Sequence, residues 1–410
     1  MNTKSFTGMS VLLLLIIGFV GGYFVGQSPW APYAFFGPAT TTPDEAKDAF
    51  SPFWEVWNLV HARYYQQPVD DELLTKGAID GMLAVLEDPH TRYLSPSDEE
   101  AARETMSGEF QGIGAEVEAV EDQIVVVSPI EGSPAEAAGL KPGDILRQAD
   151  GVDLTGMDVS EAAALVRGPA GTAVHLLIER DGEQIELDIV RDTIALKSVR
   201  SEMLDNNIAY VRLARFGNQS GKEMADALET VMANNPSGLI LDLRHNPGGS
   251  LDTAVSIADQ FLPQGVILRE QFGDGNENLY ESTDKGLAEN VPLAVLIDEG
   301  SASASEVLAG AIQDEGRGVL IGQTSYGKGT VQTWQSLSNG GGVRLTIARW
   351  LTPNKTWVNQ AGLTPDYFIP LPELTADAEP EDTQLQAAED FLTGQEIISI
   401  PPAPVEEPES

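Results

Sequence analysis

The stretch "PLAVLIDEGSASASEVLAGAIQD", residues 292–314, joins an apolar run to a helix-forming segment through three serines that alternate with alanines. The run "PLAVLID" is typical of a short strand buried on both faces of a parallel sheet. "ASEVLAGAIQD", residues 304–314, predicts a helix that begins within the serine-containing segment. A strand leading into a helix is the unit of an α/β fold. Taken alone, the three hydroxyl groups are explained by helix capping, with Ser301 best placed as the cap.

The same alternation extends through residues 193–372. Candidate strands are "IAYVRLAR", "GLILDLR", "PLAVLID" and "GVLIGQT", and the other candidate helices are "GKEMADALETVMAN" and "DTAVSIADQFL". Short apolar strands separated by helices predict a mainly parallel sheet covered on both faces. "GGVRLTIARWLTP" then adds an antiparallel strand. We therefore expect an α/β core over 193–372.

Other patterns flank this core. Residues 107–192 predict a β-rich unit with two short helices and a hairpin that turns at Asp181-Gly182. Residues 44–106 show helical spacing and predict a helical subdomain. Residues 373–410 are acidic and contain one helical stretch, "DTQLQAAEDFL", before a Pro- and Glu-rich end that we expect to be disordered.

Composition excludes several classes of protein. With 410 residues the chain exceeds one ordinary core, so several domains are expected. The 24 basic and 63 acidic residues give a net charge of −39, which argues against nucleic-acid binding. The absence of cysteine excludes disulfides, thiol nucleophiles and thiolate metal sites.

The N-terminal region predicts a membrane anchor. Residues 9–26, "MSVLLLLIIGFVGGYFVG", are apolar and uncharged, and their length is about the minimum that spans a bilayer. The run is long for the core of a signal peptide, although "APYA" at 31–34 offers a cleavage site. We expect residues 1–8 in the cytoplasm, an uncleaved anchor at 9–26, a linker at 27–43 and the body outside the cytoplasm.

Three Gly-rich segments follow candidate strands of the core. They are "LDLRHNPGG" at 241–249, "EGSASASE" at 299–306 and "QTSYGKGTVQ" at 323–332. Open α/β sheets place their sites at the carboxyl ends of parallel strands, so the three loops are expected to converge.

A nucleophilic serine in this position requires a base. Lys328 lies between Gly327 and Gly329 just beyond an apolar strand, and partial burial there would lower its pKa and make it a competent base. Gln332, four residues later, could orient the amine. His245, in the first Gly-rich loop, is the alternative base. The residues alone leave both open.

Several motifs in the same order resemble those of the C-terminal processing peptidases, or tail-specific proteases, which are serine peptidases with an embedded PDZ domain. They are "DPHTRYL" (88–94), "FQGIGAEV" (110–117), "GSPAEAAGLKPGDIL" (132–146), "RGPAGT" (167–172), "LDLRHNPGG", "GSASASEVLAGA" and "YGKGTVQ". The resemblance covers residues 50 to 370 approximately.

The resemblance assigns roles to individual residues. It implies Ser303 as the nucleophile, Lys328 as its base and Gln332 as the partner of the lysine. The backbone N–H groups of Ala304 and Gly248, with Gly249 as an alternative to Gly248, would form the oxyanion hole. Glu306 matches the glutamate of the family motif and is an auxiliary candidate.

The β-rich unit then corresponds to the PDZ domain. The resemblance implies that the segment Gly112, Ile113, Gly114 and Ala115 binds the terminal carboxylate of a peptide, which adds as a strand to the sheet edge. Arg167 matches an arginine that in relatives links the PDZ domain to the active site.

These inferences predict a membrane-anchored serine endopeptidase that binds protein C-termini and cleaves near the C-terminus of exported proteins with a Ser-Lys dyad. The expected partners are the C-terminal tails of substrates and, through 9–26, the membrane; a homo-oligomer or an adaptor protein stays open. No metal, organic cofactor or nucleic acid is expected. The alternatives are a non-catalytic, membrane-tethered PDZ scaffold and a hydrolase that uses His245.

Overall fold

The computed structural model describes residues 44–130, 132–371 and 382–400. The predicted anchor at 9–26, its flanking segments and the predicted disordered end at 401–410 lie outside these ranges. Within them, no helix combines the length and the apolarity needed to cross a bilayer.

The chain divides into two compact units at Thr75 and Lys76. The first contains the helices α2 (Asp44–Ala49) and α3 (Ser51–Arg63) and the start of α4 (Asp71–Ala84). The helix α3 buries none of its residues, and its aromatic side chains contact one another along the helix.

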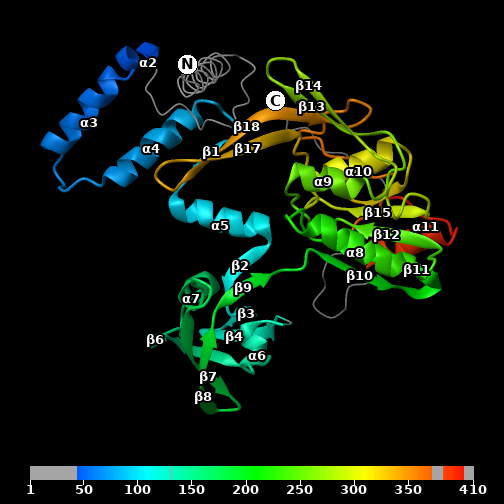
Figure 1. Ribbon diagram of the computed structural model, residues 1–410, viewed down its shortest axis with the longest axis horizontal. Coiled ribbons are helices and arrows are strands. Elements are labelled where there is room, and N and C mark those ends of the chain that lie inside the picture. The colour runs from blue at the N-terminus through cyan, green and yellow to red at the C-terminus, as the bar shows by residue number, and fades with distance from the viewer. Residues whose placement is uncertain (1–43, 131, 372–381, 401–410) are drawn as a thin grey trace, which may run out of the picture. The chain divides into compact units, whose positions relative to one another are not determined.

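The second unit contains the predicted parallel sheet. Its strand order is β10-β11-β12-β15-β16-β19, and all neighbours except β10 and β11 are parallel. Figure 1 labels β10, β11, β12 and β15 of this sheet. The strands span Val199–Met203, Ile208–Leu213, Gly238–Asp242, Leu293–Ile297, Val319–Gly322 and Tyr367–Phe368. The prediction of a mainly parallel core sheet is therefore confirmed.

Both faces of this sheet are covered by helices. Alternate residues of each strand point to opposite sides, so each strand contributes to two separate cores. Leu239, Leu241 and Val295 pack with α8, α9 and α10, whereas Ile240 and Leu296 pack with α11. These helices span Ser220–Met232, Leu251–Ala258, Ala304–Asp314 and Thr383–Leu392. The near-continuous apolar strands noted in the sequence are explained by burial on both sides.

A second, antiparallel sheet of the same unit was not predicted as such. Its order is β1-β18-β13-β14, and β17 pairs with β18. The strands are β1 (Arg92–Leu94), β13 (Val266–Phe272), β14 (Glu277–Glu281), β17 (Thr330–Ser336) and β18 (Gly342–Leu351). The segment 44–106, predicted as a helical subdomain, also contains one short strand. After α4 the chain forms β1, which pairs with β18, before α5 (Pro96–Ser107).

The β-rich segment forms its own sheet and core. Its order is β3-β4-β5-β7-β8, with β6 paired to β5, and α6 and α7 complete it. The strands are β3 (Ala115–Val120), β4 (Gln123–Pro129), β5 (Ile145–Ala149), β6 (Val152–Asp153), β7 (Ala173–Arg180) and β8 (Glu183–Val190). The helices are α6 (Pro134–Ala137) and α7 (Val159–Val166). The hairpin at Asp181-Gly182 joins β7 to β8 as predicted. In the chain, β2 (Glu109–Gly112) precedes this sheet and β9 (Asp192–Ala195) follows it, and the two strands pair as an antiparallel ribbon.

Candidate active site

The three Gly-rich loops predicted to converge line one cavity of about 660 Å³. The first loop follows β12, the second connects β15 to α10, and the third leads from β16 into β17. The residues predicted for chemistry that line this cavity are Gly248, Gly249, Ser303, Ala304, Lys328, Gln332 and His245. They converge because β12, β15 and β16 run parallel, so that the carboxyl ends of these strands lie at the same edge of the sheet.

Ser303 occupies the N-cap position of α10 with φ 55° and ψ −113°. This is a rare conformation for a residue with a Cβ, and such strain persists only where the surroundings impose it. Ser303 is half-buried in the cavity, whereas Ser301 is fully buried. The Ser301 hydroxyl donates to the carbonyl of Leu243 at 2.8 Å and accepts from the Asp298 N–H at 3.0 Å. The expectation that Ser301 caps the helix was therefore wrong.

Ser305, for which the sequence indicated no function, is buried and donates to the carbonyl of Asn246 at 2.8 Å. The side chain of Asn246 donates to the carbonyl of Leu213 at 2.7 Å and accepts from the Gly248 N–H at 2.9 Å. These bonds fix the loop after β12 against the start of α10.

Glu306 links the loop that carries Ser303 to the loop that carries Lys328. Its carboxylate is fully buried and accepts four hydrogen bonds. Oε2 accepts from the Ser303 N–H at 2.8 Å and the Lys328 N–H at 2.9 Å. Oε1 accepts from the Ser325 hydroxyl at 2.6 Å and the Gly327 N–H at 2.7 Å. A buried carboxylate requires such donors, so its position fixes both loops.

Lys328 is half-buried, as its two flanking glycines suggested. Desolvation lowers the pKa of its amine to about 8, with Arg344 adding to the decrease and Glu306 and Asp88 opposing it. Each glycine is required for space. A Cβ at Gly327 would lie 2.8 Å from the Gly362 nitrogen, and one at Gly329 would lie 2.6 Å from the Trp357 ring nitrogen.

Gln332 lies on β17 and lines the cavity, but its bonds differ from the prediction. Its Nε2 donates to the hydroxyls of Thr330 at 2.8 Å and Thr346 at 3.2 Å. Its Oε1 accepts from Nη2 of Arg344 at 3.1 Å rather than from the lysine amine.

Gly248, Gly249 and Ala304, the candidates for the oxyanion hole, line the same cavity as Ser303. Among the described residues, none accepts a hydrogen bond from the N–H of Ala304 or of Gly249, whereas the Gly248 N–H is bonded to Asn246. Gly248 has φ 94°, and a Cβ there would lie 2.6 Å from the Ala302 carbonyl oxygen and 2.8 Å from the Ala304 nitrogen. Only glycine permits this approach. Of the two glycines, Gly249 has the unengaged N–H group in this structure.

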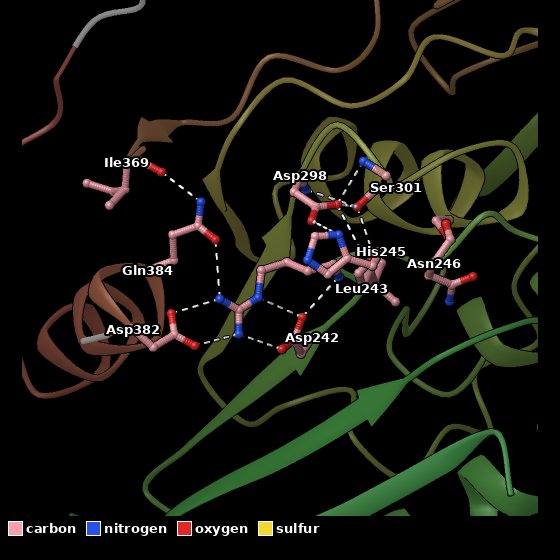
Figure 2. Close-up of polar contacts among 12 residues, drawn as sticks. Asp242, Leu243, His245, Asn246, Asp298, Ser301, Ile369, Asp382 and Gln384 are labelled. Atoms are coloured by element: carbon pink, nitrogen blue, oxygen red, sulfur yellow. Dashed lines mark hydrogen bonds and ion pairs between the residues drawn. The ribbon is translucent and has the colours of Figure 1, made fainter. Parts of the chain in front are cut away.

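His245 lies at the rim of the same cavity, with 66% of its side chain exposed. Its Nδ1 is 2.7 Å from Oδ2 of the buried Asp298, whose Oδ1 accepts from the His245 and Gly300 N–H groups (Figure 2). No hydrogen bond between His245 and Ser303 is formed. The partner Asp298 ends the strand run "PLAVLID" and was not identified from the sequence.

The loop after β12 is also tied to the C-terminal helix. Arg244 forms ion pairs with Asp242 at 2.7 Å and with Asp382, the N-cap of α11, at 2.8 Å (Figure 2). Gln384 accepts from Arg244 at 3.2 Å and donates to the carbonyl of Ile369 at 2.8 Å. The predicted acidic C-terminal segment thus contributes a helix that anchors the loop carrying Gly248.

Sequence reasoning missed three residues near Lys328. Arg344 comes from β18, and Asp88 and His90 come from the turn before β1. Asp88 accepts from the Thr91 hydroxyl at 2.6 Å and from the His90 N–H at 2.9 Å. Burial lowers the pKa of His90, and the charge of Lys328 lowers it further. The turn residues "DPH" were a signal, but assigning them to a helical subdomain concealed their position.

The predicted carboxylate-binding segment lies between β2 and β3. Gly114 has φ 77°, and its carbonyl accepts from the Ile130 N–H at 2.9 Å and the Ser133 hydroxyl at 2.8 Å. The strand β3, which begins at Ala115, is the edge strand of its sheet and contacts α7. This free edge beside a helix is the geometry that an added peptide strand requires.

Arg167 follows α7 and contacts Glu104 and Phe110. Its Nη1 is 3.4 Å from the Glu104 carboxylate, and its guanidinium is 5.2 Å from the centre of the Phe110 ring. Arg167 is not among the described residues that line the cavity around Ser303. Among the described residues, the arginine bonded to Gln332 is Arg344.

Comparison with known proteins agrees with this architecture. Family models match peptidase family S41 at residues 207–369, a PDZ domain at 125–180 and the N-terminal domain of the activating protease CtpB at 17–99. The carboxy-terminal processing protease CtpA of Bacillus subtilis is 39% identical over 321 residues, covering 78% of this chain and 68% of that protein. The carboxyl-terminal-processing protease of Synechocystis is 36% identical over 353 residues, covering 84% of this chain and 82% of that protein.

The crystal structure of an S41 protease from Bacteroides fragilis shares the fold, with a TM-score of 0.53 at 17% identity, covering 87% of this chain and 93% of that one. The predicted fold of an S41 peptidase core with a PDZ domain is confirmed. The chain belongs to peptidase family S41, among the carboxy-terminal processing proteases.

Proposed function

We propose that this serine-type protease cleaves polypeptides near their C-termini with Ser303 as the nucleophile and Lys328 as the base. The neutral amine of Lys328 takes the Ser303 hydroxyl proton as the oxygen attacks the scissile carbonyl. The N–H groups of Ala304 and of Gly248 or Gly249 stabilise the oxyanion. The leaving amine accepts the proton, and water then hydrolyses the acyl-enzyme.

The observation that supports this assignment best is the bond pattern of Glu306. Its Oε2 binds the backbone N–H groups of both Ser303 and Lys328, so one buried atom holds the two catalytic loops together. His245 also lines the cavity, but two-thirds of its side chain is exposed and its Nδ1 is paired with Asp298. The half-burial of Lys328, which lowers its pKa to about 8, favours the lysine as the base.

The PDZ domain supplies the recognition of substrate tails in this proposal. The free edge of β3 would pair with an extended C-terminal tail, whose carboxylate would reach the segment Gly112–Ala115. We further propose that residues 9–26 anchor the protein in a membrane with its catalytic body outside the cytoplasm, as their apolar composition suggests. The alternative is a tethered scaffold that binds tails without cleaving them.

A single substrate pair tests this function. A polypeptide that ends in apolar residues with a free carboxylate should be cleaved near its C-terminus. The same chain with an amidated end should be cleaved at least about tenfold more slowly, because the amide cannot form the charge-assisted hydrogen bonds of the carboxylate. Mass spectrometry of the products gives the cleavage position. Saturable binding of the free-carboxylate chain without any product would instead establish the scaffold.

The pH dependence identifies the base. Lysine acts as a base only in its neutral form, so with a pKa of about 8 for Lys328, kcat/KM should rise about tenfold per pH unit below that value and level off above it. The measurement is kcat/KM for one peptide between pH 6 and 10 approximately, in wild type and in His245→Ala.

His245→Ala should keep this profile and most of the activity. A wild-type profile that levels off near the ordinary histidine pKa of about 6.5, together with loss of activity in His245→Ala, would assign the base to His245.

A further inference from the structure

The cavity around Ser303 is basic and apolar in an acidic protein. Asp and Glu account for 63 of the 410 residues, but none of the described residues that line the cavity is acidic. Its titratable side chains are Arg215, His245, Lys328 and Arg344. A concave site lined by one sign of charge, with apolar walls, concentrates groups of the opposite charge.

Arg344 belongs to this set and is half-buried, but the protein places little negative charge beside its guanidinium. Among the described residues, no carboxylate oxygen lies within ion-pair distance of it, and its guanidinium donates one side-chain hydrogen bond, to Gln332. Arg244 provides the contrast, since that buried guanidinium is matched by the carboxylates of Asp242 and Asp382. A guanidinium has five N–H donors, so Arg344 keeps donors for a further acceptor.

The charged groups around Arg344 destabilise its positive charge, which a bound anion would stabilise. Arg92 on β1 lies directly opposite Arg344 in the antiparallel pair, and like charges in that position are destabilising. Burial lowers the pKa of the Arg344 guanidinium, and Arg92 lowers it further. Asp88 is close enough to oppose this effect, but its carboxylate is engaged by Thr91 and His90.

We propose that Arg344 forms a carboxylate-binding subsite beside Ser303, so that the protease selects substrates with an anionic group close to the scissile bond. A planar guanidinium binds a carboxylate through two parallel hydrogen bonds, which gives both affinity and orientation. The carboxylate comes from an Asp or Glu side chain or from the end of a short tail. Because Arg344 also bonds Gln332, the anion is recognised next to Lys328. This inference rests on the proposed function of the same site.

The test is a scan of peptide substrates with one fixed apolar tail. Each position flanking the cleavage site carries Glu in one peptide and Gln in its partner, and the readout is the ratio of their kcat/KM values. Assays at about pH 9 keep Lys328 mainly neutral. Wild type should prefer Glu by about tenfold or more at one or two adjacent positions, and Arg344→Met should reduce that ratio to about one. Arg344→Lys should keep part of it.

A second series distinguishes the two sources of the carboxylate. Tails shortened so that they end at the preferred position are compared as free acid and as amide, in wild type and in Arg344→Met. An acid preference that Arg344→Met removes identifies the chain end as a ligand of the subsite, whereas an effect confined to the first series identifies acidic side chains.

Matched variants separate this subsite from a general effect of charge. Arg92→Met removes an exposed arginine outside the cavity lining and should keep the Glu preference. A preference that persists in Arg344→Met, or that is lost only in Arg215→Met, overturns the proposal. So does a wild type without any Glu preference, or an Arg344→Met variant that changes only the pH profile. Absence of hydrolysis of every peptide contradicts the proposed function itself.

Discussion

Ser303→Ala is expected to lower kcat/KM for peptide hydrolysis by about 10⁴- to 10⁶-fold, because the attacking oxygen is removed while the rest of the cavity stays in place. The side chain of Ser303 is half-buried in the cavity, and its backbone N–H remains bonded to Glu306 in the variant. Alanine retains the Cβ, so it keeps the strained backbone at φ 55° without relaxing it. The measurement is single-turnover cleavage of a peptide with a free apolar C-terminus.

Ser305→Ala is the matched control for this prediction. Ser305 lies two residues away on the same helix turn, but its hydroxyl is buried against the Asn246 carbonyl. Its loss should cost about 1–2 kcal/mol of stability and leave Ser303 able to attack. A Ser303→Ala protein that cleaves at the wild-type rate would exclude Ser303 as the nucleophile. Equal losses in the two variants would show that the helix start, rather than one hydroxyl, is what the reaction requires.

Glu306→Gln is expected to have the second largest effect, on both stability and activity. The carboxylate accepts hydrogen bonds from Ser303, Ser325, Gly327 and Lys328, and all four are donors. An amide of the same shape presents its own N–H₂ group to two of these donors. Donors left without an acceptor in a fully buried site cost about 1–3 kcal/mol each.

The loops that carry Ser303 and Lys328 would then separate, and kcat/KM should fall by about 10³-fold, since small displacements of catalytic groups are costly. Thermal unfolding and peptide hydrolysis provide the two readouts. Glu306→Asp keeps the charge but shortens the side chain, so its activity should lie between those of wild type and Glu306→Gln. A Glu306→Gln variant with wild-type kcat/KM would show that Glu306 does not position the two loops for the reaction.

The sequence predicted the parallel core well. The strands β11, β12, β15 and β16 are buried on both faces, so their runs are almost entirely apolar and are easily recognised. The antiparallel sheet was harder to predict. In β17 the exposed and half-buried residues do not alternate cleanly, and the register shifts between Val331 and Gln332. A bulge of this kind disturbs the period of two by which strands are recognised.

For the candidate site, the sequence likewise predicted some features and not others. The spacing of Gly-rich loops after strands indicated where Gly248, Ser303 and Lys328 would meet, because the ends of parallel strands lie at one edge of a sheet. The functions of the three serines were not separable from the pattern. Ser301, Ser303 and Ser305 have similar neighbours in the sequence, and only the carbonyl groups that approach from the loop after β12 distinguish them.

From the sequence alone came the periodic features of this protein, namely the α/β alternation and the order of the loops, and its motifs pointed by resemblance to the PDZ segment and to the proposed serine and lysine. Which distant groups surround these residues depends on the tertiary fold. Glu306 accepts from two loops, Asp298 orients His245, and Arg344 reaches Gln332 from another strand. Local periodicity reports the direction of each side chain, whereas hydrogen bonding, burial and pKa depend on groups that are distant in the chain and meet only when the sheets form.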